Sequence, residues 1–381
     1  MTSLKNNEPR IDPEEILAGI REWVEIETPS ADGAAVNRLV DVVERQLRDA
    51  GQQVERRRGR DGFGDLLVGR SPWGESEKGI LVVAHLDTVH PVGSLAGAMP
   101  WRRDRDSVHG PGIYDMKAGG HMAFYAYRHL VRLGRRTPLP ITFLFVPEEE
   151  VGSPTSREII EREAARAKYA LVVEPARDGG KIVLARKGAA MFTIRTHGRA
   201  AHAGMRHQDG RSAIKEMARQ IVDLEAMTDY ESGLTVSVGT VRGGTVTNVV
   251  PALCQVDVDM RIPSPELVET SVARVLGLKA YDHDVRIEVE GGLNRPPYDV
   301  DAGIAALFEH AKELAREIGF DLEGVKTGGG SDGNFTAALG VPTLDGLGAD
   351  GRGAHAPEEQ IYFSSLLPRT QLLLRLFETL R

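Results

Sequence analysis

Three consecutive glutamates, Glu148 to Glu150, are the clearest candidates for chemistry in this sequence. They follow an apolar run, Ile141–Val146, that is rich in β-branched and aromatic residues. An uninterrupted run of this kind predicts a strand buried on both faces. In open α/β sheets, ligands bind beyond the carboxyl ends of such strands. Two carboxylates about 4 Å apart repel by roughly 4 kcal/mol at an effective dielectric constant of about 20. The glutamates therefore form either a solvated acidic turn or part of a cation site.

Other polar residues occur at the same kind of position, directly after an apolar strand or in a loop beside one. His85 and Asp87 follow the apolar run 80–84, and Glu174 follows the apolar run 169–173. Histidine nitrogens and carboxylate oxygens, without cysteine, suit zinc and less specifically manganese or cobalt. One ion would leave much of the negative charge uncompensated, so the set favours two bridged metal ions. The full candidate set is His85, Asp87, Asp115, Glu149, Glu150, Glu174 and His355.

The elements that position these residues are predicted to form an α/β domain. The segment 89–112 is rich in glycine and proline in its first half and predicts a loop over the strand ends. Asp12 is the predicted N-cap of the first helix, with Pro13 at its first position and Glu15 completing a capping box. Predicted strands span 53–58, 65–70, 80–84, 141–146, 169–173 and 341–344, and predicted helices span 13–26, 33–50, 116–133, 156–167, 302–318 and the end of the chain from 364.

Between Lys187 and Tyr298 the pattern changes from buried runs to alternation, which is typical of half-exposed antiparallel strands. Its strands (190–196, 234–241, 253–262, 285–289) and helices (212–226, 266–278) follow the order β-α-β-β-α-β of a ferredoxin-like unit. We therefore expect a discontinuous catalytic domain, 1–187 and 299–381, with an inserted α+β lid and dimerisation domain, 188–298. The catalytic domain is expected to hold a mostly parallel mixed sheet with helices on both faces.

Composition limits the class of protein. A length of 381 residues predicts two domains or one domain with a large insertion. The hydrophobic fraction of 41% and charged fraction of 27% are typical of globular proteins. A net charge of -8 argues against nucleic-acid binding. No apolar run reaches the length of a membrane span, and the first ten residues are polar. The single cysteine, Cys254, is expected to be a small core residue. We expect a cytoplasmic protein that binds neither membrane nor nucleic acid.

Five blocks of the sequence resemble the metal-site blocks of a family of two-zinc hydrolases. The blocks are V-A-H-L-D-T-V, G-I-Y-D-M-K, E-E-V-G-S, V-V-E-P-A and G-R-G-A-H-A-P-E-E, in order over nearly the whole chain. The family includes glutamate carboxypeptidase, acetylornithine deacetylase and succinyl-diaminopimelate desuccinylase. The resemblance implies that Asp115 bridges two zinc ions, with cobalt or manganese as alternatives. It assigns His85 and Glu174 to one site, and Glu150 and His355 to the other.

The same resemblance implies roles in the reaction. Glu149 would be the general base that takes a proton from a metal-bridging water and passes it to the departing amine. Asp87 is placed to orient the imidazole of His85. His202, in G-R-A-A-H-A-G, would polarise the substrate carbonyl from the lid, often from the partner subunit of a homodimer. Asn248 would assist it.

The resemblance is closest to the glutamate carboxypeptidase branch, which implies cleavage of an amide bond next to a free carboxylate. Arg261 matches the position from which relatives hold that carboxylate, a task suited to a bidentate guanidinium. It can equally pair with Asp257 or Asp259. N-acyl-amino-acid deacylase and dipeptidase activities are the alternatives of the same mechanism. Further candidates for the substrate pocket are Gly329, Gly330, Ser331 and Lys187.

One departure and three rival interpretations remain. Relatives usually carry aspartate at the position of Glu148 and a small residue at that of Pro147, so the role of Glu148 is open. Gly329–Gly333 fits the G-x-S-x-G motif of serine hydrolases, with Ser331 and His355 as nucleophile and base, but no clear buried strand precedes it. A non-catalytic binding protein would not need a complete set of ligands and base. No G-x-G-x-x-G follows a strand, so dinucleotide binding lacks support.

Overall fold

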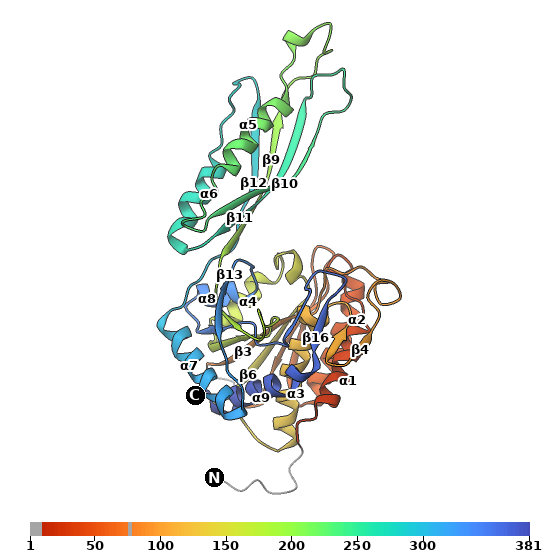
Figure 1. Cartoon of the computed structure of the whole chain (residues 1–381), viewed down its shortest axis with the longest axis vertical. Coiled ribbons are helices and arrows are strands. Elements are labelled where there is room, and N and C mark those ends of the chain that lie inside the picture. Colours follow the sequence, from red (N-terminus) through yellow and green to blue (C-terminus); the bar gives the residue numbers. More distant parts are fainter. Residues whose placement is uncertain (1–9, 75–77) are drawn as a thin grey trace. The chain divides into compact units, whose positions relative to one another are not determined.

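The computed structural model describes residues 10–74 and 78–381, which form two compact units (Figure 1). The first unit contains the chain up to Leu184 together with Val300–Lys326 and Ser331–Arg381. The second unit contains Ala185–Asp299 and Thr327–Gly330. The short segment Thr327–Gly330 differs from the sequence-based division, which assigned it to the first unit.

The first unit is built on a six-stranded mixed sheet with the order β1-β2-β6-β3-β7-β14. Neighbouring strands from β6 to β14 are parallel, whereas β1 and β2 are antiparallel additions at one edge. The predicted mostly parallel mixed sheet is confirmed. Its strands are β1 (Gln53–Arg57), β2 (Leu66–Arg70), β3 (Gly79–His85), β6 (Ile141–Val146), β7 (Ala167–Val172) and β14 (Thr343–Leu344), and its helices are α1 (Pro13–Val24), α2 (Gly33–Asp49), α3 (Ala118–Arg132), α4 (Arg157–Ala164), α7 (Ala302–Ile318), α8 (Gly333–Ala338) and α9 (Phe363–Thr379).

Helices cover both faces of this sheet, as its apolar strands require. On one face, the ring of Phe143 in β6 packs edge-on against Phe377 of α9, and α9 in turn contacts α1 and α3. On the other face, Leu144 belongs to a buried cluster with Ile160 of α4 and Phe335 of α8. Successive residues of β6 thus point to opposite faces and both are buried, which explains why the sequence shows a continuous apolar run.

The helix predicted from Met116 begins instead at Ala118, and this correction affects Asp115. Residues Ile113–Lys117 form one π-helical turn in which Asp115 and Met116 have non-helical backbone angles. Helix α3 then passes close to the end of β7, because a Cβ atom at Gly119 would lie 1.8 Å from the carbonyl oxygen of Val173. Only glycine allows this approach.

Two further expectations about local structure are wrong. The segment 89–112 contains two short strands, β4 (Arg102–Asp104) and β5 (Ser107–His109), in a small antiparallel sheet of order β15-β16-β5-β4. Strands of three residues carry too little periodicity to be recognised. The other members are β15 (Gly351–Arg352) and β16 (Gln360–Tyr362). The sequence also missed β8 (Ile182–Arg186) and β13 (Gly324–Thr327), which pair with each other.

The first helix starts as predicted, but without a capping box. The Asp12 carboxylate accepts a hydrogen bond from the Glu14 backbone N–H, which caps α1. Glu15 does not reach back to the N-cap. Its carboxylate accepts from the hydroxyl of Tyr125 at 2.7 Å and pairs with Arg128 and Arg132 of α3. A tertiary contact between α1 and α3 has replaced the expected local one.

The second unit has the predicted order β-α-β-β-α-β. Its antiparallel sheet has the order β10-β11-β9-β12, the strand arrangement of a ferredoxin-like unit. Cys254 lies in its core with 1% of its surface exposed, as expected. The elements are β9 (Gly188–His197), α5 (Ala213–Glu225), β10 (Thr235–Gly243), β11 (Leu253–Ile262), α6 (Val268–Leu276) and β12 (Arg286–Arg295).

None of the helices in the described part of the chain is both long and apolar enough to span a membrane.

Candidate metal centre

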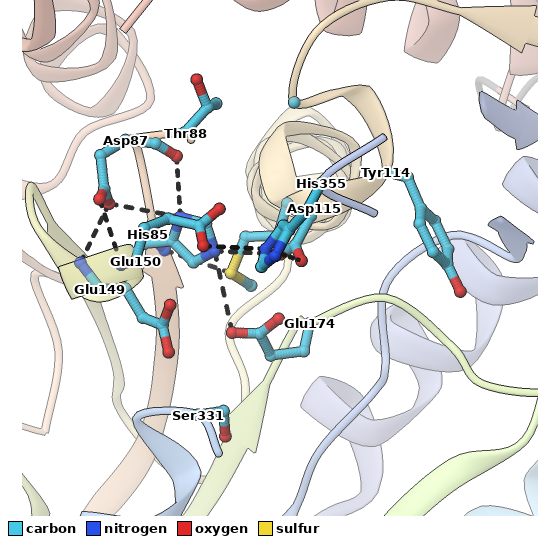
Figure 2. Close-up of polar contacts among 12 residues, drawn as sticks. His85, Asp87, Thr88, Tyr114, Asp115, Glu149, Glu150, Glu174, Ser331 and His355 are labelled. Atoms are coloured by element: carbon cyan, nitrogen blue, oxygen red, sulfur yellow. Dashed lines mark hydrogen bonds and ion pairs between the residues drawn. The ribbon is translucent and has the colours of Figure 1, made fainter. Parts of the chain in front are cut away.

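The candidate residues of the first unit meet at one edge of the main sheet. Strand β3 lies between β6 and β7 and runs parallel to both, so the carboxyl ends of all three strands reach the same edge. His85 is the last residue of β3 and pairs in register with Val146, the last residue of β6. Glu150 follows β6 in a short 3-10 turn, and Glu174 follows β7. Figure 2 shows these side chains converging on Asp115 and His355.

Asp115 occupies the centre of this cluster. Its Oδ1 lies 3.2 Å from Nε2 of His85, and its Oδ2 lies 3.4 Å from Nε2 of His355. His85 Nε2 is also 3.9 Å from Oε1 of Glu174, and His355 Nε2 is 2.9 Å from Oε2 of Glu150. Each oxygen of Asp115 thus lies near one histidine, and each histidine lies near one further acid. The same two groupings are the ligand sets that the sequence resemblance implies.

Glu149 lies beside this cluster. One ligand atom each from His85, Glu149 and Glu174 falls within 4.8 Å of the others, and so does one each from His85, Asp115 and Glu150. The carboxylate of Glu149 is therefore close enough to act on a molecule held at the cluster.

The electrostatics of the cluster favour a bound cation. Burial, together with the charges of Asp115 and Glu149, raises the pKa of Glu174 well above its ordinary value. Burial likewise raises the pKa of Glu150, whose Oε1 atom is buried and accepts no hydrogen bond in the described part of the chain. Hydrogen bonds to Asp115 and Glu150 raise the pKa of His355 to about 10. Divalent metal ions would replace these protons and pair with the orphaned oxygen, so the residues present fit the metals that the donor set implies.

Asp87 connects several candidate residues at once. Its carboxylate accepts hydrogen bonds from the backbone N–H groups of Glu149 at 3.1 Å and Glu150 at 3.2 Å. Nδ1 of His85 lies 3.4 Å from its Oδ1 and 3.0 Å from its backbone oxygen. The sequence predicted only the contact with His85. Asp87 therefore positions the turn of Glu149 as well as the imidazole.

Sequence reasoning missed two supporting residues. The hydroxyl of Ser30 donates to Oδ2 of Asp87 at 2.6 Å. Its signal was weak, because Ser30 precedes a helix where a small polar residue is ordinary. Glu359, fully buried, accepts hydrogen bonds from the loop that carries Asp115. It lies within the last recognised block, but nothing local to it indicates its partners.

The open question about Glu148 has a structural answer. Its side chain is fully buried and accepts four hydrogen bonds, from the backbone N–H and the hydroxyl of both Thr155 and Ser156, at 2.7 to 3.0 Å. Glu148 therefore closes the loop between β6 and α4.

Four of the remaining candidates, His202, Asn248, Arg261 and Lys187, lie in the second unit, where two of them are neighbours. The backbone N–H of Ala203 donates to the carbonyl of Asn248, so the segments that carry His202 and Asn248 lie side by side. Both residues are exposed. Arg261 makes a bidentate pair with Asp259, at 2.8 Å for both bonds. This is one of the two pairings that the sequence left open. Lys187 donates to the carbonyl of Gly233.

The glycine-rich segment around Gly329, Gly330 and Ser331 is divided between the two units. The carbonyl oxygens of Gly329 and Gly330 accept hydrogen bonds from Arg186 in the second unit. Ser331, in the first unit, is fully buried and donates its hydroxyl proton to Asp345. His355 contacts Glu150 and Asp115 and not Ser331. The described residues thus supply no Ser331–His355 pair for a serine hydrolase.

Comparison with known proteins identifies the family of this chain. The model of peptidase family M20/M25/M40 matches residues 81–379. Carboxypeptidase G2 from Pseudomonas sp. (strain RS-16) is 31% identical over 362 residues, which cover 93% of this chain and 86% of that protein. A tripeptidase from Staphylococcus aureus has a similar structure, with a TM-score of 0.78 and 20% identity over 97% of this chain and 99% of the other. An M20 family metallo-carboxypeptidase from Sulfolobus solfataricus aligns with a TM-score of 0.74 and 17% identity, over 97% and 100% of the two chains.

The family match covers most of the chain, including the strand ends that carry the candidate metal ligands, and members of this family are metal-dependent hydrolases. The chain therefore belongs to peptidase family M20/M25/M40 and is a hydrolytic enzyme of the metallopeptidase class.

Proposed function

We propose that this enzyme is a two-metal hydrolase that cleaves an amide bond next to a free carboxylate, as a glutamate carboxypeptidase does. The observation that carries the proposal is the position of Asp115 between two histidine–acid pairs. His85, Asp115 and Glu174 would hold one divalent ion, and Asp115, Glu150 and His355 the other. The nitrogen and oxygen donor set suits zinc, with cobalt or manganese as alternatives.

In this proposal Glu149 moves the proton. Bound metal ions would supply Lewis acidity, which acidifies water and polarises a carbonyl. Glu149, held by the hydrogen bond from its N–H to Asp87, accepts the proton of the attacking water and then protonates the departing amine. Asp87 also holds Nδ1 of His85, which leaves Nε2 directed at the ligand cluster.

Substrate selection is assigned mainly to residues of the second unit, with Ser331 of the first unit as a further candidate. We propose that Arg261 binds the substrate carboxylate, with Gly330, Ser331 and Lys187 contributing to the same pocket. The guanidinium of Arg261 already holds a carboxylate in bidentate geometry, that of Asp259, which supports its fitness for this task. Asp259 would then compete with substrate, so Asp259→Asn should lower KM.

The second unit is further proposed to be a lid and dimerisation domain from which His202 and Asn248 reach the substrate carbonyl of the partner subunit. Strand β10 lies at an open edge of its sheet, and Val241 on this strand is 61% exposed. Val222 on the adjoining helix α5 is 67% exposed. An unpaired edge beside apolar side chains suits a second copy of the same unit.

Complementation tests this arrangement. Co-expressed Glu149→Gln and His202→Ala chains form mixed dimers in which one site combines an intact Glu149 with an intact His202 from the other chain. If His202 acts across the dimer, the mixed protein recovers up to half of the activity per dimer, although each variant alone is inactive. Mixed dimers that stay inactive would place His202 in its own subunit's site, and a monomer in sedimentation would exclude the interface.

N-acyl-amino-acid deacylase and dipeptidase activities remain the second candidates, because they use the same metal cluster. A mass-spectrometric screen of N-acyl amino acids, peptides with C-terminal acidic residues and dipeptides, with added zinc, cobalt or manganese, separates them. Release of a C-terminal glutamate or aspartate as the fastest reaction would support carboxypeptidase activity. The similarity to carboxypeptidase G2 already favours this activity. Faster cleavage of neutral dipeptides or simple N-acetyl amino acids would favour an alternative.

The lone, buried Cys254 is compatible with the reducing cytoplasm that we propose as the location.

A further inference from the structure

The buried carboxylate of Glu359 joins two loops that lie far apart in the sequence. Its Oε1 accepts hydrogen bonds from the backbone N–H groups of Tyr114 at 2.8 Å and Asp115 at 2.9 Å. Its Oε2 accepts from the N–H of Gly112 at 2.9 Å and from Nε2 of His90 at 2.7 Å. All four donors come from a region 244 to 269 residues earlier in the chain.

Both of these loops carry candidate metal ligands. Asp115 itself donates one of the four bonds, and His355 precedes Glu359 by one turn of the loop that leads into β16. Strand β16 pairs with β5, which ends just before Gly112, so the pairing brings Glu359 against the 112–115 turn. Gly112 has a φ of 69°, and a Cβ there would lie 2.2 Å from Cγ2 of Thr88. A residue other than glycine would therefore collide with Thr88 at this turn.

We propose that Glu359 is a positioning residue for the metal centre: by binding three backbone N–H groups of the 112–115 turn, its carboxylate fixes Asp115 relative to His355 before metal binds. Carboxylates that accept several backbone N–H groups hold such turns strongly, because each bond is charge-assisted. When the ligands are already in place, less ordering of the protein accompanies metal binding, so the metal binds more tightly. The inference rests on the proposed two-metal function.

Glu359 does not contact the metal in this proposal, so its effect should appear in metal affinity without any substrate. Glu359→Gln keeps the shape of the side chain but turns an N–H₂ group towards donors. We expect it to weaken zinc binding by 10- to 100-fold, as outer contacts of metal ligands commonly do. It should also speed hydrogen exchange at the amides of Gly112, Tyr114 and Asp115 in the metal-free protein. The matched control is Glu358→Gln, at the neighbouring exposed position.

The test is a competition titration of metal-free protein with zinc against a chromophoric chelator, combined with hydrogen exchange followed by mass spectrometry. His90→Leu removes one of the four donors while leaving Glu359 in place, and His90→Gln offers an amide donor instead. His90→Leu should weaken zinc binding in the same direction and His90→Gln should restore it. This pair decides the question if Glu359→Gln does not fold.

The outcomes are distinguishable. Suppose that wild type binds two zinc ions, and that Glu359→Gln or His90→Leu binds them as tightly as the control Glu358→Gln. Glu359 then has no effect on metal affinity, and the inference is wrong. The same holds if the variants lose stability while their zinc affinity is unchanged. If wild type itself binds no zinc, cobalt or manganese, the proposed two-metal function fails, and the inference fails with it.

Discussion

The three glutamates after β6 occupy three different environments. Glu150 points into the ligand cluster, with its Oε2 atom 2.9 Å from His355. Glu149 has its backbone N–H bound by Asp87 and its carboxylate beside His85 and Glu174. Glu148 is turned away from the cluster and fully buried among hydroxyl and N–H donors. One short run therefore contains a proposed ligand, a proposed base and the anchor of the loop that follows them.

Replacing Glu148 should affect stability before chemistry. In Glu148→Gln, an N–H₂ group faces the donors of Thr155 or Ser156, so buried donors lose their acceptor. We expect the free energy of unfolding in urea to fall by about 1 to 3 kcal/mol. Glu158→Gln, at an exposed position of α4, is the control and should change it little. Equal stability of the two variants would show that the four hydrogen bonds of Glu148 contribute nothing net.

The residues that the sequence could identify are those whose position follows from a strand end. His85, Glu150 and Glu174 each follow a recognisable buried strand, and parallel neighbours bring such ends together. Ser30 and Glu359 could not be identified in this way. Their partners lie 57 and 244 or more residues away, so only the folded chain brings the groups within hydrogen-bond distance.

At the scale of elements, long apolar segments were predictable and short or irregular ones were not. Strand β6 and helix α7 have the predicted bounds, because burial imposes a pattern over many residues. Strands β4 and β5, of three residues each, impose no pattern. The helix predicted to begin at Met116 begins at Ala118, because Asp115 and Met116 lie in a turn with non-helical backbone angles, where the N–H of Asp115 is bound by Glu359.

The contact between α1 and α3 predicts a pH dependence of stability. His121 of α3 is 1% exposed and packs edge-on against Trp23 of α1, with ring centroids 5.3 Å apart. Burial, assisted by the charge of Arg128, lowers the pKa of His121 to about 3. In the unfolded chain the ordinary value is about 6.5. Between these pH values the unfolded state binds one more proton than the folded state, so this contribution to stability is lost as pH falls from about 6.5 towards 3.

His121→Gln should remove that dependence. The difference in free energy of unfolding between wild type and variant is expected to fall by up to about 1.4 kcal/mol for each pH unit below 6.5. Urea unfolding of both proteins at several values between pH 8 and pH 5 measures it. Taking the difference cancels the carboxylates and other histidines that both proteins share. Parallel pH curves for the two proteins would mean that His121 binds its proton equally well in the folded and unfolded states, which would contradict the lowered pKa.

At the scale of the whole molecule, the candidate metal centre joins segments from the start, middle and end of the first unit. Metal ions that bind only the folded chain should therefore stabilise it. Zinc at about 100 times its dissociation constant should add roughly 2.7 kcal/mol per site to the free energy of unfolding. Thermal unfolding of chelator-treated protein with and without zinc tests this. Asp115→Asn, which lacks the shared carboxylate charge, should show a much smaller shift in Tm, and equal shifts would remove Asp115 from the metal site.

The sequence predicts an inserted domain from the change from buried to alternating strands at Lys187. It does not predict the attachment of Thr327–Gly330 to the second unit, because that attachment depends on hydrogen bonds from Arg186 to two glycine carbonyls. Substrate preference also lies beyond local patterns. Arg261 carries a carboxylate partner of its own, and the same fold serves carboxypeptidases and tripeptidases among the similar proteins.

The central claim is that Glu149 transfers the proton at a two-metal centre that it does not itself bind. Its most direct test is the kcat of Glu149→Gln on the best substrate of the screen, with metal content measured on the same samples. We predict two metal ions per chain in both proteins, and a fall in kcat of about 100- to 10,000-fold in the variant. Full activity of Glu149→Gln at unchanged metal content would contradict the account.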